Sequence, residues 1–279
     1  TLAFKMRFWN IGAEGQMIAG AIFATAVGLY LPNINHILLM VLMFIAAIIG
    51  GGLWGLIPAV FKIKYNTNET LFTLMLNYIA LYVISILRDG IWKDPTSTLP
   101  KIIRFSQNAC LDKVAGVHFG WIVALVLVVF VYVYMRYTKQ GYEIAVVGES
   151  PATANYAGMN VNKIIVRTMF LSGAAAGIAG MVKAAGSDLT LSQSVAGGIG
   201  FTAIIVAWLS QLNPITILVV TILLSALEKG CSAISSVYPL MSADCADILQ
   251  GIILFFILGC ELFVRYKFVI FGGAKGGKN

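Results

Sequence analysis

The chain has 279 residues, of which 59% are hydrophobic and only 11% are charged, and its mean hydropathy is +0.88. Because a soluble domain carries roughly 25% charged residues, this composition excludes a soluble globular protein and makes lipid the main solvent. The formal net charge of +7 is spread over loops instead of forming the aromatic-interleaved patches of a nucleic-acid binder. We therefore interpret this charge as a signal of membrane topology.

The first segment combines an apolar helix with polar groups at membrane depth. Residues 17–31 are too short to span comfortably alone, but a helix that starts near Phe8 is long enough. Such a helix places Asn10, Glu14 and Gln16 inside the bilayer, where an acid costs about 2.5–3.5 kcal/mol on insertion scales. We expect these groups to face a water-filled cavity or the bundle interior. The alternative places Glu14 at the interface, with its carboxylate reaching water.

The remaining apolar runs predict an all-α polytopic membrane protein with about eight membrane segments, some of them short or broken. After the first segment, the predicted segments are residues 37–61, 69–87, 120–137, 164–185, 201–209, 214–227 and 248–264. The small residues Gly50, Gly51, Gly52 and Gly55, and those in the run 172–180, predict close helix packing. Residues 88–118 and 228–247 are predicted to be external loops.

Two of these segments carry further candidates for a solute pathway. Asn77 lies within an apolar span and needs a partner, either a neighbouring helix or a solute. Residues 201–209 are too short to span, and irregular backbone at that depth is tolerated only inside protein or beside a cavity. Asn213 and Pro214 then restart a helix, since Asn caps helices and Pro suits the first position.

The polar segment 136–163 lies between two apolar runs and contains a small helix with its own start and stop signals. Ser150 can cap the free N–H groups, Pro151 suits the first helical position, and Gly158 can adopt the left-handed conformation that ends the helix. Two turns of helix are not stable alone in water, so this helix must rest against a partner. An ordinary interhelical loop with one ordered turn is the alternative.

The basic residues orient the predicted spans with the loop 136–163 in the cytoplasm, if the basic tail 265–278 is also there. The predicted cytoplasmic residues form most of the 19 Lys and Arg: Lys5, Arg7, Lys62, Lys64, Arg136, Lys139, Lys163, Arg167, Arg265, Lys267, Lys275 and Lys278. The other basic residues lie mostly in the long loop 88–118, and long loops contribute little to orientation.

We find no motif for catalysis, a metal or a cofactor. Residues 272–278, GGAKGGK, match the spacing of a phosphate-binding loop, but Asn279 follows where Ser or Thr is required. The cysteines have no CxxC spacing or histidine companion: they are Cys110, Cys231, Cys245 and Cys260. Cys231 and Cys245 flank one predicted loop and could pair on an oxidising side, or remain free thiols. Any ATP is therefore expected to be hydrolysed by a partner subunit.

Several runs together resemble the permease subunits of ATP-binding-cassette (ABC) importers, in the group that transports branched-chain amino acids, ribose and nucleosides. The runs are FWNIGAEGQMIAG (8–20), MLNYIALY (75–82), VGESPATANYAGMNV (147–161), SGAAAGIAG (172–180) and GIGFTAI (198–204). They are most similar to the nucleoside-type permeases. The resemblance implies one transmembrane permease domain over residues 1–279, which starts at Thr1 after N-terminal trimming, in a bacterial cytoplasmic membrane.

The resemblance also implies partners and site residues. The partners are cytoplasmic ATPase subunits, a second permease subunit and an extracellular solute-binding protein. The coupling helix lies at 148–159, with Gly148, Glu149, Ser150, Pro151, Tyr156 and Gly158 toward the ATPase. The pathway residues are expected to be Asn10, Glu14, Gln16, Asn77, Phe201, Thr202 and Trp208. A nucleoside is the expected solute.

The alternatives to a nucleoside permease fall into two classes. Within the same family, the solute is a sugar or a branched-chain amino acid. In a different class, the chain is a secondary transporter or a channel. Trp9, Ala145, Thr202 and Ser210 depart from the residues usual in the nucleoside group, which leaves the solute open.

Overall fold

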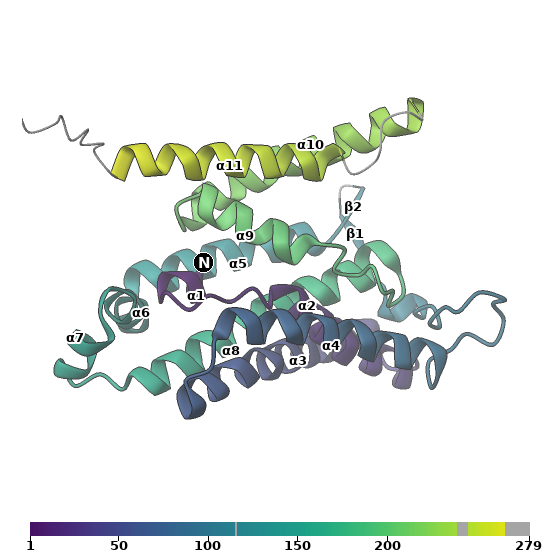
Figure 1. The fold of residues 1–279 in the computed structure, drawn as a ribbon. Coiled ribbons are helices and arrows are strands. Elements are labelled where there is room, and N and C mark those ends of the chain that lie inside the picture. The colour runs from purple at the N-terminus through teal and green to yellow at the C-terminus, as the bar shows by residue number, and fades with distance from the viewer. Residues whose placement is uncertain (115, 239–244, 266–279) are drawn as a thin grey trace, which may run out of the picture. The chain divides into compact units, whose positions relative to one another are not determined.

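The computed structural model describes residues 1–114, 116–238 and 245–265, and the chain divides into two compact units, Thr1–Leu218 and Val219–Asn279. The first unit is helical apart from one short hairpin (Figure 1). The first part of the chain forms α1 (Leu2–Lys5), α2 (Ala13–Tyr30), α3 (His36–Tyr65), α4 (Glu69–Asp89), the 3₁₀ turn η1 (Gln107–Ala109), and the antiparallel strands β1 (Lys113–Val114) and β2 (Val117–His118). It continues with α5 (Gly120–Tyr137), α6 (Lys139–Glu149), α7 (Pro151–Tyr156), α8 (Val161–Val182), the π-helical turn η2 (Lys183–Asp188), α9 (Ile199–Leu209), α10 (Pro214–Val237) and α11 (Cys245–Arg265).

The all-helical membrane architecture predicted from composition is confirmed in its main features. Within the described residues, five helices are long and apolar enough to cross a membrane: α3, α4, α5, α8 together with η2, and α10. The short apolar helix predicted near 201–209 is present as α9, with 11 residues. The total of about eight membrane segments stays a prediction.

Glycines bring the backbones of α2, α3 and α8 into direct contact. A Cβ atom added to Gly177 of α8 would overlap the carbonyl oxygen of Ala47 and lie 3.0 Å from the Cα of Gly51 on α3. A Cβ atom on Gly20 of α2 would overlap Gly177 itself. Small residues at helix crossings allow this approach, and van der Waals contact then holds the helices together in lipid. The close packing predicted from the two glycine-rich runs is therefore confirmed.

A second hydrophobic core, separate from the crossing of α2, α3 and α8, includes side chains of the polar segment that follows α5. The side chains of α1, α6 and α7 pack there against α3, α5 and α8: the buried members include Leu2, Met6, Phe8, Ala59, Tyr134, Ile144, Val147, Ala154, Ile164 and Met169. This second core anchors α6 and α7 to the other helices of the first unit.

Three predicted boundaries were wrong: the first helix was predicted to begin too early, and two others were predicted to end where charged residues begin. Helix α2 begins at Ala13 and not near Phe8, so Asn10 precedes the helix. Lys62 and Lys64 lie in the last turn of α3, and the chain turns at Asn66, whose φ is 50°. The predicted loop 228–247 is helical up to Val237, since charged residues such as Glu228 end an apolar run but favour helix.

The crossing of α2, α3 and α8 gives a first testable prediction. Gly177→Ala should lower the melting temperature of the detergent-solubilised protein by several degrees, because overpacking a tight crossing costs about 1–3 kcal/mol. The matched control is Gly230→Ala on α10, where no atom of the described residues beyond the adjoining helix backbone lies within 4 Å of the added Cβ. Alanine at this open helical position should be neutral or stabilising. Equal melting temperatures for the two variants would contradict this packing.

Candidate translocation and coupling sites

The segment that leads into α2 is connected to α4 by hydrogen bonds of buried and partly buried groups. The backbone N–H of Ile11 donates to Thr73 Oγ1 at 3.2 Å, and its carbonyl accepts from Asn77 Nδ2 at 3.0 Å. The backbone N–H of Gly15 donates to Asn77 Oδ1 at 2.9 Å. Asn77 thus satisfies one donor and one acceptor of the segment, which supports the reading that its partner is a neighbouring helix.

Asn10 and Gln16 form a reciprocal amide pair within the same region. Asn10 Nδ2 donates to Gln16 Oε1, and Gln16 Nε2 donates to Asn10 Oδ1, both at 3.2 Å. Asn10 Oδ1 also accepts from the backbone N–H of Gly12 at 3.0 Å. Asn10 is 5% exposed and Gln16 is 1% exposed, so the two amides compensate each other's burial in place of water.

Glu14 joins the start of α2 to the start of α9. Its Oε1 accepts from the backbone N–H of Gly198 and its Oε2 from that of Gly200, both at 2.8 Å, and the residue is 6% exposed. The carboxylate therefore caps a helix that has no N-cap side chain of its own, and it lies at the positive end of the helix dipole. Gly198 has a φ of 83°, and a Cβ at Gly200 would lie 2.6 Å from Glu14 Oε2. Glycine is required at both positions for this contact.

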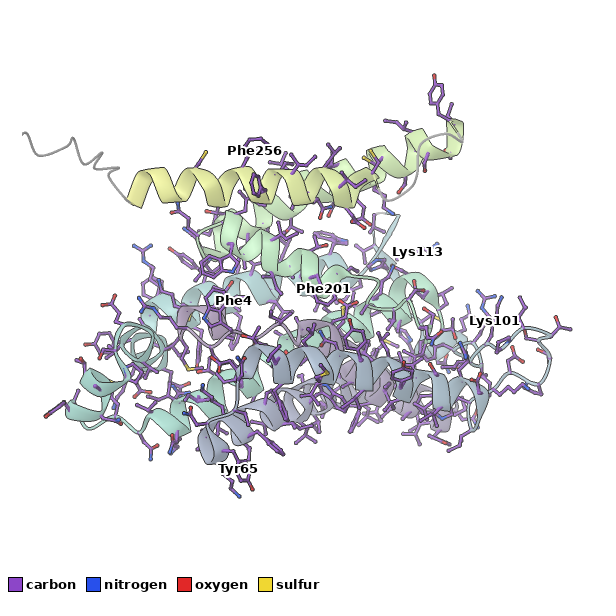
Figure 2. All side chains as sticks on the ribbon, viewed as in Figure 1. Phe4, Tyr65, Lys101, Lys113, Phe201 and Phe256 are labelled. Atoms are coloured by element: carbon purple, nitrogen blue, oxygen red, sulfur yellow. The ribbon has the colours of Figure 1, made fainter. Side chains whose placement is uncertain are left out.

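The aromatic candidates divide into a stacked cluster and one separate ring. Trp9 stacks on Trp208 with 5.4 Å between ring centroids, and Phe4 packs on the pair at 6.0 Å and 5.9 Å. Phe201, which is 42% exposed, lies on α9 about two helical turns before Trp208 and is labelled in Figure 2. One face of Trp9 and one face of Trp208 are therefore occupied by each other in this conformation, while Trp9 remains 47% exposed.

The structure brings together four of the seven predicted pathway residues, Asn10, Glu14, Gln16 and Asn77, around the start of α2. Thr202 lies one turn into α9, where its hydroxyl donates to the Gly198 carbonyl at 3.4 Å. Ser210, at the end of α9, is 2% exposed and its hydroxyl has no hydrogen-bond partner among the described residues. Sequence reasoning missed Thr73 and Gly198, because only the tertiary structure shows which polar groups they bind.

The short helix α7 has the start and stop signals that the sequence predicts. Ser150 Oγ accepts from the backbone N–H of Thr153 at 3.2 Å, Pro151 takes the first helical position, and Gly158 has a φ of 75°. Ala154 is fully buried against the second core, whereas Tyr156 is 96% exposed. Helix α7 is thus anchored through Ala154, and its one large side chain, Tyr156, is exposed.

Gly148 and Glu149 do not belong to this helix but end the preceding one, α6, which the sequence analysis did not predict. Gly148 is buried, and a Cβ there would overlap the carbonyl oxygen of Lys5 in α1. Helix α6 is fastened to α8 by an ion pair of 3.0 Å between Glu143 and Arg167. The expected single coupling helix at 148–159 is therefore two helices with a turn at Ser150, where the capping geometry breaks the backbone path.

The cysteines and acidic residues outside these regions form no further site in the part of the chain that the structure describes. All four cysteines are free thiols there, including Cys231 and Cys245. Within the same ranges no group of three His, Cys, Asp or Glu side chains is placed to hold a metal ion. The glycine-rich run 272–278 and most of the basic tail lie outside the described residues.

Comparison with known proteins identifies the family. Residues 1–258 match the family described as the permease component of branched-chain amino acid transport systems. A glucose ABC transporter permease of Haloferax volcanii is 33% identical, over 95% of this chain and 73% of that protein. A guanosine ABC transporter permease of Bacillus subtilis is 32% identical over 91% and 74%, and a nucleoside ABC transporter permease of Lactococcus lactis is 30% identical over 92% and 73%.

No solved structure matched the chain. The family match covers most of the sequence, and the relatives align over more than two thirds of their own lengths. This match decides against a secondary transporter or a channel and in favour of a transport subunit that works with a separate ATPase. The chain belongs to the permease components of the branched-chain amino acid transport family and is a membrane-embedded permease subunit of an ABC transporter.

Proposed function

We propose that this permease imports a nucleoside across the cytoplasmic membrane of a bacterium. The observation that carries the proposal is the similarity to two permeases named for guanosine and for nucleosides, at 32% and 30% identity over more than nine tenths of the chain. A sugar is the second candidate, because the glucose permease is 33% identical over a similar length. A cytoplasmic ATPase, an extracellular solute-binding protein and a second permease subunit, either a sibling chain or an identical copy, complete the transporter.

The pathway in this proposal runs beside the start of α2 and the start of α9. Glu14 holds the two helix starts together through Gly198 and Gly200, while the amides of Asn10, Gln16 and Asn77 satisfy the backbone around them. When the ATPase subunits close, α9 shifts relative to α2 and these hydrogen bonds rearrange. The buried groups thus brace the resting state and become available to the solute as it passes.

In this proposal, α7 is the contact through which ATP hydrolysis by the partner subunit is coupled to transport. The exposed ring of Tyr156 inserts into a pocket of the ATPase, as aromatic anchors do at protein interfaces. Because Ala154 and the ion pair between Glu143 and Arg167 connect α7 and α6 to α8, motion of the ATPase reaches the membrane helices.

The solute proposal is tested by uptake of radiolabelled guanosine into proteoliposomes that contain the complete transporter and ATP. Excess unlabelled adenosine or uridine should reduce uptake, whereas glucose or leucine should not. A transporter without ATP provides the background. Competition by glucose without any effect of nucleosides would contradict the nucleoside proposal and support the sugar alternative.

The role of Glu14 is tested by Glu14→Ala and Glu14→Gln. Each charge-assisted hydrogen bond is worth about 1.5–3 kcal/mol, so Glu14→Ala should reduce transport about tenfold or more, with assembly on the ATPase intact. Glu14→Gln should retain part of the activity, since its amide oxygen can still accept one of the two bonds. Glu228→Gln, at an exposed position on α10, is the matched control.

A cysteine substituted at position 14 or 16 distinguishes a side chain that lines the solute pathway from one that only braces the helices. Labelling by an aqueous thiol reagent in at least one transport state is expected if the side chain lines the pathway. No labelling from either side in any state would contradict lining and leave bracing alone. Transport by Glu14→Ala at the wild-type rate would contradict both roles.

Coupling is tested by Tyr156→Asp and Gly158→Val in the purified complex. Tyr156→Asp should weaken ATPase docking or reduce solute-stimulated ATP hydrolysis, because it replaces the exposed aromatic ring with a charge. Gly158→Val should act similarly, since valine opposes a φ of 75°. The control is Tyr238→Asp, which is 63% exposed outside this segment. Wild-type coupling and complex stability in both variants would refute the proposal.

A further inference from the structure

A groove between the end of α3 and the start of α8 is not explained by translocation or by ATPase docking. Its volume is about 390 Å³, and its lining includes Val60, Ile63 and Lys64 of α3 with Asn162, Lys163 and Val166 of α8. Both helices belong to the first unit and pack directly on each other through Gly55 and the carbonyl of Met169.

The two walls of the groove present the same order of side chains. On α3, Val60 lies one turn before Lys64, and on α8, Val166 lies about one turn after Lys163. Since the chain leaves the bundle at the end of α3 and re-enters it at the start of α8, both lysines lie at the outer end of the groove. The apolar residues lie deeper, so the groove is amphipathic along its length.

The end of the groove that contains Lys64 and Lys163 carries positive charge that no carboxylate of the described residues neutralises. Lys64 and Lys163 are both exposed, and neither forms an ion pair with a carboxylate in the described part of the chain. The neighbouring Lys62, by contrast, is neutralised by Glu69 at 2.8 Å. The amide side chain of Asn162 adds hydrogen-bonding capacity beside the two ammonium groups. This end therefore fits a group that carries negative charge and several acceptor oxygens.

The aromatic residues at the end of α3 place the groove at the membrane interface. Tyr65 is 68% exposed, and Figure 2 shows it projecting from the end of the helix. Phe61 is 38% exposed and stacks on Phe72 of α4 with 4.7 Å between centroids. Exposed aromatic side chains next to lysines at the end of an apolar helix are typical of the headgroup region. With this end of α3 in the headgroup region, the lysines would lie at headgroup depth and the valines at the depth of the first acyl carbons.

We propose that this groove binds one anionic phospholipid of the cytoplasmic leaflet. The phosphate contacts Lys64 and Lys163, and an acyl chain runs along Val60, Ile63 and Val166. Asn162 also lines the adjoining cavity of about 490 Å³ beside Gly158 and Met159, so the headgroup lies next to the link between α7 and α8. The leaflet rests on the proposed cytoplasmic orientation, but the amphipathic groove itself does not depend on the nature of the solute.

The test measures retention of phosphatidylglycerol and phosphatidylcholine by native mass spectrometry of the purified complex, titrated with each lipid in detergent. The wild type should retain one phosphatidylglycerol molecule in preference to phosphatidylcholine. Lys64→Gln with Lys163→Gln should weaken this binding about fivefold or more, since each lysine near a membrane surface contributes to the attraction of anionic lipid. Val166→Trp should also weaken it by filling the groove without changing the charge.

The matched control is Arg136→Gln with Lys139→Gln, which removes the same charge on the same predicted side but outside the groove. Retention should then equal that of the wild type. Inorganic phosphate at millimolar concentration should not compete, because it lacks the acyl chain; full competition would overturn the proposal in favour of a simple anion site. Wild-type lipid retention in the double lysine variant would also overturn it. If that variant retained the lipid but lost the ATPase, the two lysines would belong to the ATPase interface instead. Because the readout is lipid mass, a wrong solute assignment would not affect the result.

Discussion

The hydrogen bonds that Gly198 and Gly200 donate to Glu14 connect the start of α9 with the start of α2 across 184 and 186 positions of sequence. An unsatisfied N–H at membrane depth costs several kcal/mol, and a buried carboxylate costs more unless it is paired. Each partner therefore requires the other. The break in the helical path before α9 is stabilised by one acidic side chain, supplied from far away in the sequence, which satisfies two N–H groups at the helix start.

The close packing of α2, α3 and α8 makes that contact possible. Glycines at the crossings let the three backbones approach without side chains between them, which sets the position of α2 rigidly. The start of α2 then lies against α4, where Thr73 and Asn77 complete the backbone hydrogen bonds. Apolar packing thus determines the geometry, and the polar groups determine which part of the chain can leave the helical state.

The polar segment after α5 differs from α2 and α9, because its short helix α7 is specified by residues nearby in the sequence. Ser150, Pro151 and Gly158 define α7 without distant partners, and only Ala154 anchors it to the core. A locally specified element with an exposed aromatic side chain can dock on another protein without disturbing the membrane helices. The adjoining groove at Lys64 and Lys163 places a second exposed chemical feature next to it, so lipid and ATPase would act on neighbouring parts of one surface.

The sequence by itself determined the membrane class, the span at Gly120–Tyr137, the capped helix α7 and the short helix α9, because each depends on composition or on residues within a few positions. It also singled out Glu14 and Asn77 as polar groups at an unfavourable depth. Only the tertiary structure decided what those groups bind, that Trp9 stacks on Trp208, and that Gly148 serves the packing of α1 on α6. It also decided that α6 is a separate helix and that α10 continues beyond its apolar run. The physical reason is that hydropathy and capping are local, whereas the partner of a buried polar group depends on helix packing between residues far apart in the chain.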